Sequence, residues 1–197
     1  MKNKILLLVL LNWFSFTTQG QDLGEGRIRW SPNHKLQLTD FKIHAGSKSL
    51  DPIYSQFTIS TNAIRGLDFL KRNFNQKVEN IFLGNASWID TTNIQMLEKQ
   101  LEFQQIQFDL SEVHARKYRK KIFLNRKKLA SGGDFLNEIF DDLMIEFSKK
   151  KLELYEQTNS GQDEDKILEW KTKIQIELDE LSDFGYDNTK KLKKAGD

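Results

Sequence analysis

The polar side chains best suited to chemistry lie within a short segment, residues 101–118. Asp109 and Glu112 are three residues apart, and on a helix this spacing places both carboxylates on one face, where they could share a cleft. Paired carboxylates are common general acids and bases. However, Arg116 follows Glu112 at i+4 and offers it an ion pair worth about 0.3 kcal/mol. The sequence therefore leaves a catalytic and a structural role open for Glu112.

The histidines are the other candidates for catalysis or metal binding, and there are three of them, His34, His44 and His114. His114 lies on the same helical stripe as positions 103 and 107, about 10 Å beyond position 107 at ~1.5 Å per residue. A zinc site needs several ligands, and the chain has no cysteine to supply a thiolate. We therefore expect His114 to be structural or to lie on the surface.

The elements that must position these residues differ between the two halves of the chain. From Arg27 to about Trp88 the sequence is typical of short strands separated by turns. Apolar and polar residues alternate, or apolar residues run together, at 28–30, 36–38, 57–61 and 78–83. We expect these strands to form a sheet region against which the second half packs.

From Thr92 onward the pattern favours helices. Thr92-Asn93-Ile94-Gln95 has the form of a capping box, and the stretch from Met96 to about Leu129 contains no Gly or Pro. Its apolar residues lie on more than one face up to Arg116, which indicates a helix buried among other elements. Beyond Arg116 the helix becomes strongly basic, and we expect it to emerge into water.

Two more helices are predicted after a break at Ser131-Gly132-Gly133. Asp134 would cap the first, and a polar loop at 158–163 separates it from an amphipathic helix over 164–181. The polar tail, residues 183–197, ends with several lysines, and we expect it to be disordered. The sequence thus predicts one α+β domain over residues 21–182.

The first twenty residues have the layout of a secretory signal peptide. Lys2 and Lys4 precede an apolar run, and Thr18-x-Gly20 suits cleavage before Gln21. The run is too short to span ~30 Å of hydrocarbon, so we expect no transmembrane segment after cleavage. The protein is therefore predicted to be exported, to the periplasm or outside the cell.

The charge balance argues against nucleic acid as a partner. The full chain carries 30 Lys and Arg against 28 Asp and Glu. Because Lys2 and Lys4 belong to the predicted signal, the remaining chain has no formal net charge. A nucleic-acid-binding domain would want an excess of basic residues on its surface.

The segment Leu101–Tyr118, LEFQQIQFDLSEVHARKY, resembles the motif helix of a family of exported bacterial (Bacteroidetes-type) proteins of unknown function that are regarded as zinc-dependent proteases. That helix follows the pattern L-x-H-E-Q-x-H-F-D-I-x-E-x-x-A-R. The positions that match in register are Leu101, Gln105, Phe108, Asp109, Glu112, Ala115 and Arg116. Other segments are similar too: Ile28-x-Trp30 with Leu36 and Asp40-Phe41, Ser87-Trp88-Ile89, and Tyr155 to Gly161 with a later Trp170. Leu38 stands where the family usually has a Trp.

The resemblance implies a zincin-like α+β fold, with strands first, then a long buried helix and two further helices. It also implies a zinc held by two histidines at i and i+4, with a glutamate as general base. Here Phe103, Gln104 and Gln107 replace the first His, the Glu and the second His, and Ser160 stands where the family carries a further His. None of these side chains can replace imidazole or carboxylate. The resemblance thus implies a degenerate member with no catalytic residue, metal ligand or cofactor.

Three functions remain open. The first is a non-catalytic, pseudo-protease-like exported protein that binds a protein or peptide of the cell envelope, with Phe108, Asp109, Glu112 and Arg116 kept as framework. The second is an active hydrolase that uses a non-standard centre, with acids such as Asp109 and Glu112. The third is a purely structural role in which the old cleft is packed shut.

Overall fold

The first half of the chain forms two small three-stranded sheets. In one, the order is β1 (Arg27–Arg29), β5 (Val78–Leu83) and β4 (Phe57–Thr61), with antiparallel neighbours. In the other, the order is β2 (Ile43–Ala45), β6 (Trp88–Asp90) and β3 (Ile53–Tyr54), with β2 parallel and β3 antiparallel to β6. The computed structural model describes residues 23–45, 52–62, 68, 71–92, 94–129 and 134–193. The predicted signal peptide and the break at residues 131–133 lie outside this range.

The expected strand at 36–38 is wrong. The backbone N–H of Leu36 donates to Oε1 of Gln105, 2.8 Å away, and so is not available to a neighbouring strand. Leu38–Asp40 form a single 3-10 turn, in which the Asp40 carboxylate accepts from the backbone N–H of Gln37 at 2.8 Å. This segment is therefore fixed to a helix rather than to a sheet.

The second half forms three helices, as the sequence predicts. They are α1 (Ile94–Leu129), α2 (Asp134–Gln157) and α3 (Glu164–Glu180). Helix α1 begins at Ile94, and the Thr92 hydroxyl just before it donates to the Asp90 carboxylate. The predicted capping box involves Asn93 and the side chain of Gln95, which lie outside the described residues. Asp163 caps α3 by accepting from the backbone N–H of Lys166.

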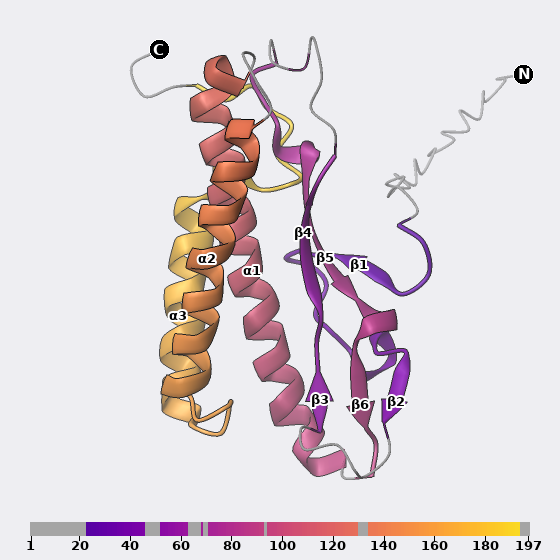
Figure 1. Cartoon of the computed structure of the whole chain (residues 1–197). Coiled ribbons are helices and arrows are strands. Elements are labelled where there is room, and N and C mark those ends of the chain that lie inside the picture. Colours follow the sequence, from indigo (N-terminus) through magenta and orange to yellow (C-terminus); the bar gives the residue numbers. More distant parts are fainter. Residues whose placement is uncertain are drawn as a thin grey trace, which may run out of the picture.

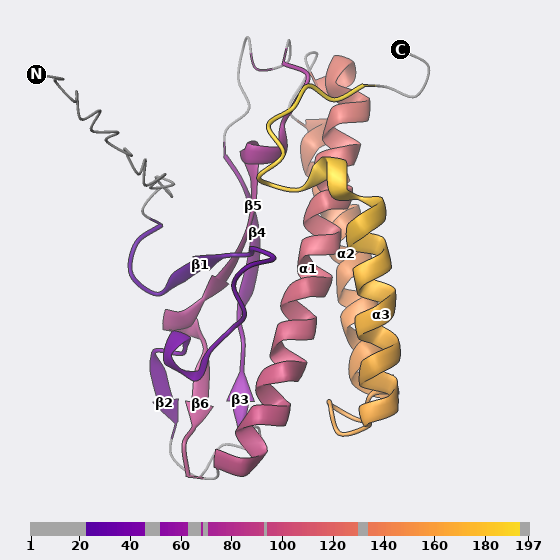
Figure 2. The same ribbon diagram turned by 180° about the vertical axis from the view of Figure 1, so that it is seen from behind.

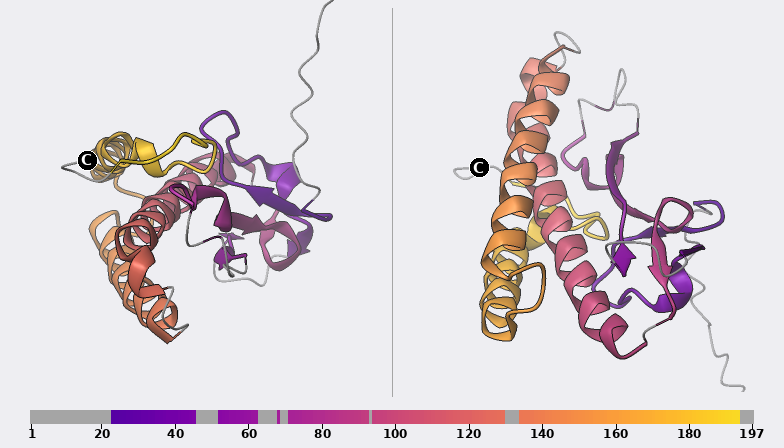
Figure 3. Two further views of the ribbon diagram at one scale, coloured as in Figure 1. Left: turned by 90° about the horizontal axis from the view of Figure 1, so that it is seen from above. Right: turned by 60° about the horizontal axis from the view of Figure 1, so that its bottom comes forward.

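Helix α1 lies between the strands on one side and α2 and α3 on the other (Figures 1 and 3). On the strand side, the Phe108 ring stacks on Phe57 of β4 with centroids 5.0 Å apart. On the other side, Tyr118 meets Phe140 of α2 at 5.5 Å. The arrangement explains why α1 is apolar on several faces, and it confirms the α+β class.

The last part of α1 does not emerge into water as expected. Tyr118, Arg119, Ile122 and Phe123 are all buried, and Leu129 is only 4% exposed. Only the outward face carries exposed side chains in these turns. The basic composition beyond Arg116 is misleading because the lysines occupy one face and the apolar residues the other.

The tail is also ordered over 183–193, contrary to expectation. It leaves α3 and crosses α1 towards the strands (Figure 2). The Phe184 ring lies 6.2 Å from that of Phe123, Asn75 donates to the backbone carbonyls of Asp183 and Asn188, and Leu192 is buried. These contacts replace the solvation that a polar tail would otherwise prefer. In the described part of the chain, no helix is long and apolar enough to cross a membrane.

Candidate functional site

Phe103, at the position where the resemblance noted in the sequence implies a first histidine, lies on α1 with its side chain only 1% exposed. Its ring meets that of Tyr155 on α2 edge-on, with centroids 5.0 Å apart. Gly161 covers the ring from the α2–α3 loop. A Cβ at Gly161 would lie 2.6 Å from Cγ of Phe103, closer than any side chain tolerates. The aromatic ring of Phe103 therefore fills the space between α1, α2 and the loop.

The loop over Phe103 is held by its own hydrogen bonds. Thr158 donates its hydroxyl to the carbonyl of Leu154 and accepts from the N–H of Gly161. Asn159, Ser160 and Gly161 all have positive φ, between 49° and 85°. Ser160 is exposed and directly precedes Gly161, the residue that lies against the Phe103 ring.

Gln104 and Gln107 are both almost completely buried, at 2% and 1% exposure. Nε2 of Gln107 donates to Oε1 of Gln104 at 3.2 Å, so that the two neutral amides bind each other. An amide cannot accept a proton at neutral pH, and its oxygen is a weak zinc ligand. The structure thus places Phe103 against the 158–161 loop and joins Gln104 to Gln107, so that these α1 positions are packed and neutral.

Asp109 fastens the N-terminal segment to α1. Its Oδ1 accepts from Nε1 of Trp30 and from Nε2 of Gln105, both at 2.7 Å. Lys35 lies 3.5 Å from the other carboxylate oxygen. Gln105 also receives the N–H of Leu36, so Asp109 and Gln105 together hold residues 30–36 against the helix.

Glu112 lies in a buried charge cluster two turns beyond Gln104. It accepts from Nε of Arg116 at 3.1 Å, which confirms the expected i+4 pair. It also accepts from Nη1 of Arg119 at 2.7 Å. The Arg119 side chain is fully buried and donates to the carbonyls of Val78 and Phe184 as well. The sequence reasoning missed Arg119, although its i+7 spacing from Glu112 places it on the same face.

The two acids of the alternative catalytic centre have separate partners. Glu112 is enclosed by two arginines, whereas Asp109 borders a small cavity of about 150 Å³ that Trp30, Lys35 and Arg116 also line. No described hydrogen bond or ion pair joins the two carboxylates. Each acid thus has hydrogen-bond and ion-pair partners of its own in the described structure.

His114 belongs to the core between α1 and α2. Nδ1 donates to the carbonyl of Leu110 at 2.9 Å, and the ring lies 5.1 Å from that of Phe147. Nε2 is buried without a hydrogen-bond partner and lies 3.8 Å from Oε1 of Glu146. Burial lowers the pKa of this imidazole below 6.5, outweighing the opposite effect of its bond to Leu110. The neutral ring is therefore the form that fits.

A cation bridges the helices next to His114. Nζ of Lys117 lies 3.1 Å from Glu146 of α2 and 3.0 Å from Glu177 of α3. Burial alone would lower the pKa of Lys117, but its bonds to Glu177 and Glu146 raise it overall. Within the described residues, no three His, Cys, Asp or Glu side chains are grouped so that they could hold a metal.

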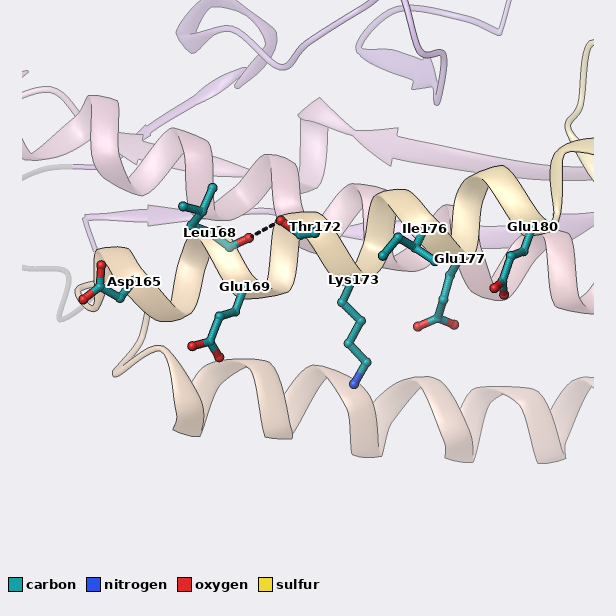
Figure 4. Close-up of a pocket in the computed structure, with 8 residues that line it drawn as sticks. All are labelled: Asp165, Leu168, Glu169, Thr172, Lys173, Ile176, Glu177 and Glu180. Carbon is teal, nitrogen blue, oxygen red and sulfur yellow. Dashed lines mark hydrogen bonds between the residues drawn. The ribbon is translucent and has the colours of Figure 1, made fainter.

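A shallow groove of about 640 Å³ runs along the outer face of α3 (Figure 4). Leu168 and Ile176 are 64% and 53% exposed there, and Thr172 between them donates to the carbonyl of Leu168. Carboxylates flank this stripe, at Asp165, Glu169, Glu177 and Glu180. The side chains spread along one helix and do not converge on a point, so the groove is a surface rather than a reaction site.

Neither a scan against models of protein families nor searches of the curated proteins and of the solved structures found a match to this chain. The resemblance to zinc-dependent proteases therefore rests on the matching residues of the sequence.

Proposed function

We propose that this protein is a non-catalytic relative of zinc-dependent proteases, exported to the cell envelope, with a zincin-like fold and a binding or structural role. The observation that carries the proposal is the packing of Phe103 beneath Gly161, beside the Gln104–Gln107 amide pair. The space in which a zinc and its water would lie is occupied by an aromatic ring and two amides that satisfy each other. The α1 helix then serves as a scaffold rather than as a reaction centre.

The position of the α2–α3 loop supports a common origin for the four degenerate positions. In the related helix a distant histidine would complete the zinc site, and Ser160 stands in its place. Gly161 lies against the Phe103 ring although the two are 58 residues apart in sequence, and this proximity supports the proposal that the loop and the α1 positions share an origin. This proximity does not follow from the motif on α1 alone.

The direct test measures metal and activity in the purified protein. Elemental analysis is expected to find no stoichiometric zinc, and unfolded casein is expected to remain intact with or without a chelator. Stoichiometric zinc, or cleavage that a chelator stops, would overturn the proposal.

A reconstruction tests the origin of the site separately. The variant Phe103→His, Gln104→Glu, Gln107→His and Ser160→His should bind about one equivalent of zinc, because three histidines then converge with an open fourth position. The matched control keeps Ser160 and changes only the three α1 positions, so it should bind zinc more weakly. If the fourfold variant folds but takes up no zinc, the four positions never formed one centre.

Export is tested by the N-terminus of the protein recovered from cells. If residues 1–20 are removed on export, intact mass should place the first residue at Gln21 and the protein outside the cytoplasm. Recovery of full-length chain from the cytoplasm alone would contradict this part of the proposal.

A further inference from the structure

The end of the molecule where α1 stops collects lysines from two parts of the chain. The tail runs past the last turns of α1 (Figures 1 and 2). It is held there because the N–H of Leu192 donates to the carbonyl of Arg72 at 3.0 Å, and Asn73 donates to the carbonyl of Lys190 at 2.6 Å. The resulting surface, which we term the basic end, consists of Lys120, Lys127, Lys190, Lys191 and Lys193, all exposed.

These lysines are distinct from those at the opposite end of α1. There, Lys99 pairs with Glu164, Lys166 with Glu169, and Lys171 with Glu102. By contrast, none of the five lysines of the basic end lies within 4.0 Å of a carboxylate in the described parts of the chain. Nearby acids do exist, at Asp183 and Asp187 on the tail and Asp141 on α2, but they form no ion pair with these five residues. The charge of the basic end is therefore available to an external anion.

The last turns of α1 pack on α2 through Ile122 and Leu129, but another face of these turns is exposed. The last ion pair between α1 and α3 is that of Lys117 with Glu177, and α3 ends at Glu180. Lys120, Leu124 and Lys127 follow at i, i+4 and i+7 spacing, so they share one face. Leu124 is 46% exposed among these cations, which makes an amphipathic face with an apolar residue between positive charges.

We propose that the basic end binds the surface of an anionic phospholipid membrane. Ammonium groups are point charges that suit a diffuse layer of lipid phosphates, whereas recognition of nucleic acid favours the forked guanidinium of arginine. All five charges are lysines, and Leu124 lies where it can reach the boundary between headgroups and acyl chains. This inference does not depend on the loss of catalysis proposed above.

Vesicle co-sedimentation of the purified protein tests the proposal. Vesicles of phosphatidylcholine are compared with vesicles that contain about 30% phosphatidylglycerol, a composition that gives a negative surface potential. Any retained apolar N-terminal segment would bind both kinds alike, so the readout is the ratio of the two. We expect at least about tenfold stronger binding to the anionic vesicles at low salt, declining as salt shortens the Debye length.

Lysine-to-glutamine substitutions show which part of the surface binds the anionic vesicles. Neutralising Lys120, Lys127 and Lys191 to Gln should lower the anionic partition coefficient about a hundredfold, since each lysine near the surface contributes about a factor of five. The matched control, Lys99→Gln, Lys166→Gln and Lys171→Gln, removes the same charge from the opposite end and should leave binding within about threefold. Equal binding to neutral and anionic vesicles, equal loss in both variants, or binding to duplex DNA but not to anionic vesicles would each overturn the proposal.

Discussion

Helix α1 has two layers whose buried polar residues differ in charge, one around positions 103–107 and the other around positions 112–119. At Phe103, Gln104 and Gln107, α1 has only neutral groups, and they are packed among themselves. Two turns later, Glu112 and Arg119 remain charged although both are almost completely buried. The first layer packs against the α2–α3 loop, whereas the second joins α1 to β5 and the tail. The difference teaches that buried charge on α1 is found where it connects elements, whereas the layer around Phe103 is neutral.

The largest effect is expected from breaking the charged layer. Arg119→Met leaves the carbonyls of Val78 and Phe184 without their donor and removes one partner of the buried Glu112. Loss of a buried ion-pair partner costs about 3–5 kcal/mol, measurable by urea unfolding. Arg126→Met on the same helix is the control, because Arg126 has no described carboxylate partner and should cost less than about 1 kcal/mol. Equal losses in the free energy of unfolding for the two variants would mean that the ion pair with Glu112 does not stabilise the fold.

The packing around Phe103 can be disturbed by a substitution in the α2–α3 loop that covers its ring. Gly161→Ala combines a positive φ of 85° with a Cβ that collides with Phe103, and these should cost about 3 kcal/mol together. In the double variant with Phe103→Ala, the new methyl enters the space the ring has left. The combined loss should therefore be smaller than the sum of the two single losses. Simple additivity would show that the ring and the loop are not coupled.

A third effect depends on pH and comes from His114, which is buried between α1 and α2. The pKa of His114 lies below 6.5 in the folded protein, so the unfolded chain takes up the proton first. Stability should be full above pH ~6.5 and decrease below it, by up to about 1.4 kcal/mol per pH unit down to the folded pKa. His114→Gln should remove this slope, whereas His44→Gln, at an exposed position, should keep it. Glu146, whose pKa is lowered by Lys117, adds its own loss only at more acidic pH.

The smallest effect is expected within the neutral layer. Replacing Gln104 and Gln107 together by Leu removes both partners of one hydrogen bond and should change stability by less than about 1 kcal/mol. Gln107→Leu alone leaves the Gln104 carbonyl unpaired and should cost about 1–3 kcal/mol. A double variant that is less stable than the single one would contradict the view that these amides serve mainly each other.

The sequence predicts the helices well because each carries its own periodic signal. The three helices and the general strand region follow from local pattern, and so does the pair of Glu112 with Arg116. In the segment at 36–38, apolar and polar residues alternate as in a strand. Its conformation nevertheless depends on the hydrogen bond from Leu36 to Gln105, 69 residues away. Such long-range partners leave no trace in a local pattern.

The composition of α1 and the tail misleads for a similar reason. Basic residues beyond Arg116 suggest a solvated end, but Tyr118 and Arg119 are held by distant segments. For the candidate site, the resemblance identifies positions 103, 104, 107 and 160, whereas Gly161 as the cover of Phe103 becomes evident only in three dimensions. The basic end likewise requires the tail and α1 to be placed side by side.

The crossing of the tail has a consequence for how this chain is made. Asn75 and Arg119 each donate to backbone carbonyls between residues 183 and 188, close to the end of the 197-residue chain. Until residues 183–188 have left the ribosome, the buried donors have no acceptors and the core stays incomplete. The fold between α1 and the strands is thus completed only when this segment, made after all three helices, takes its place.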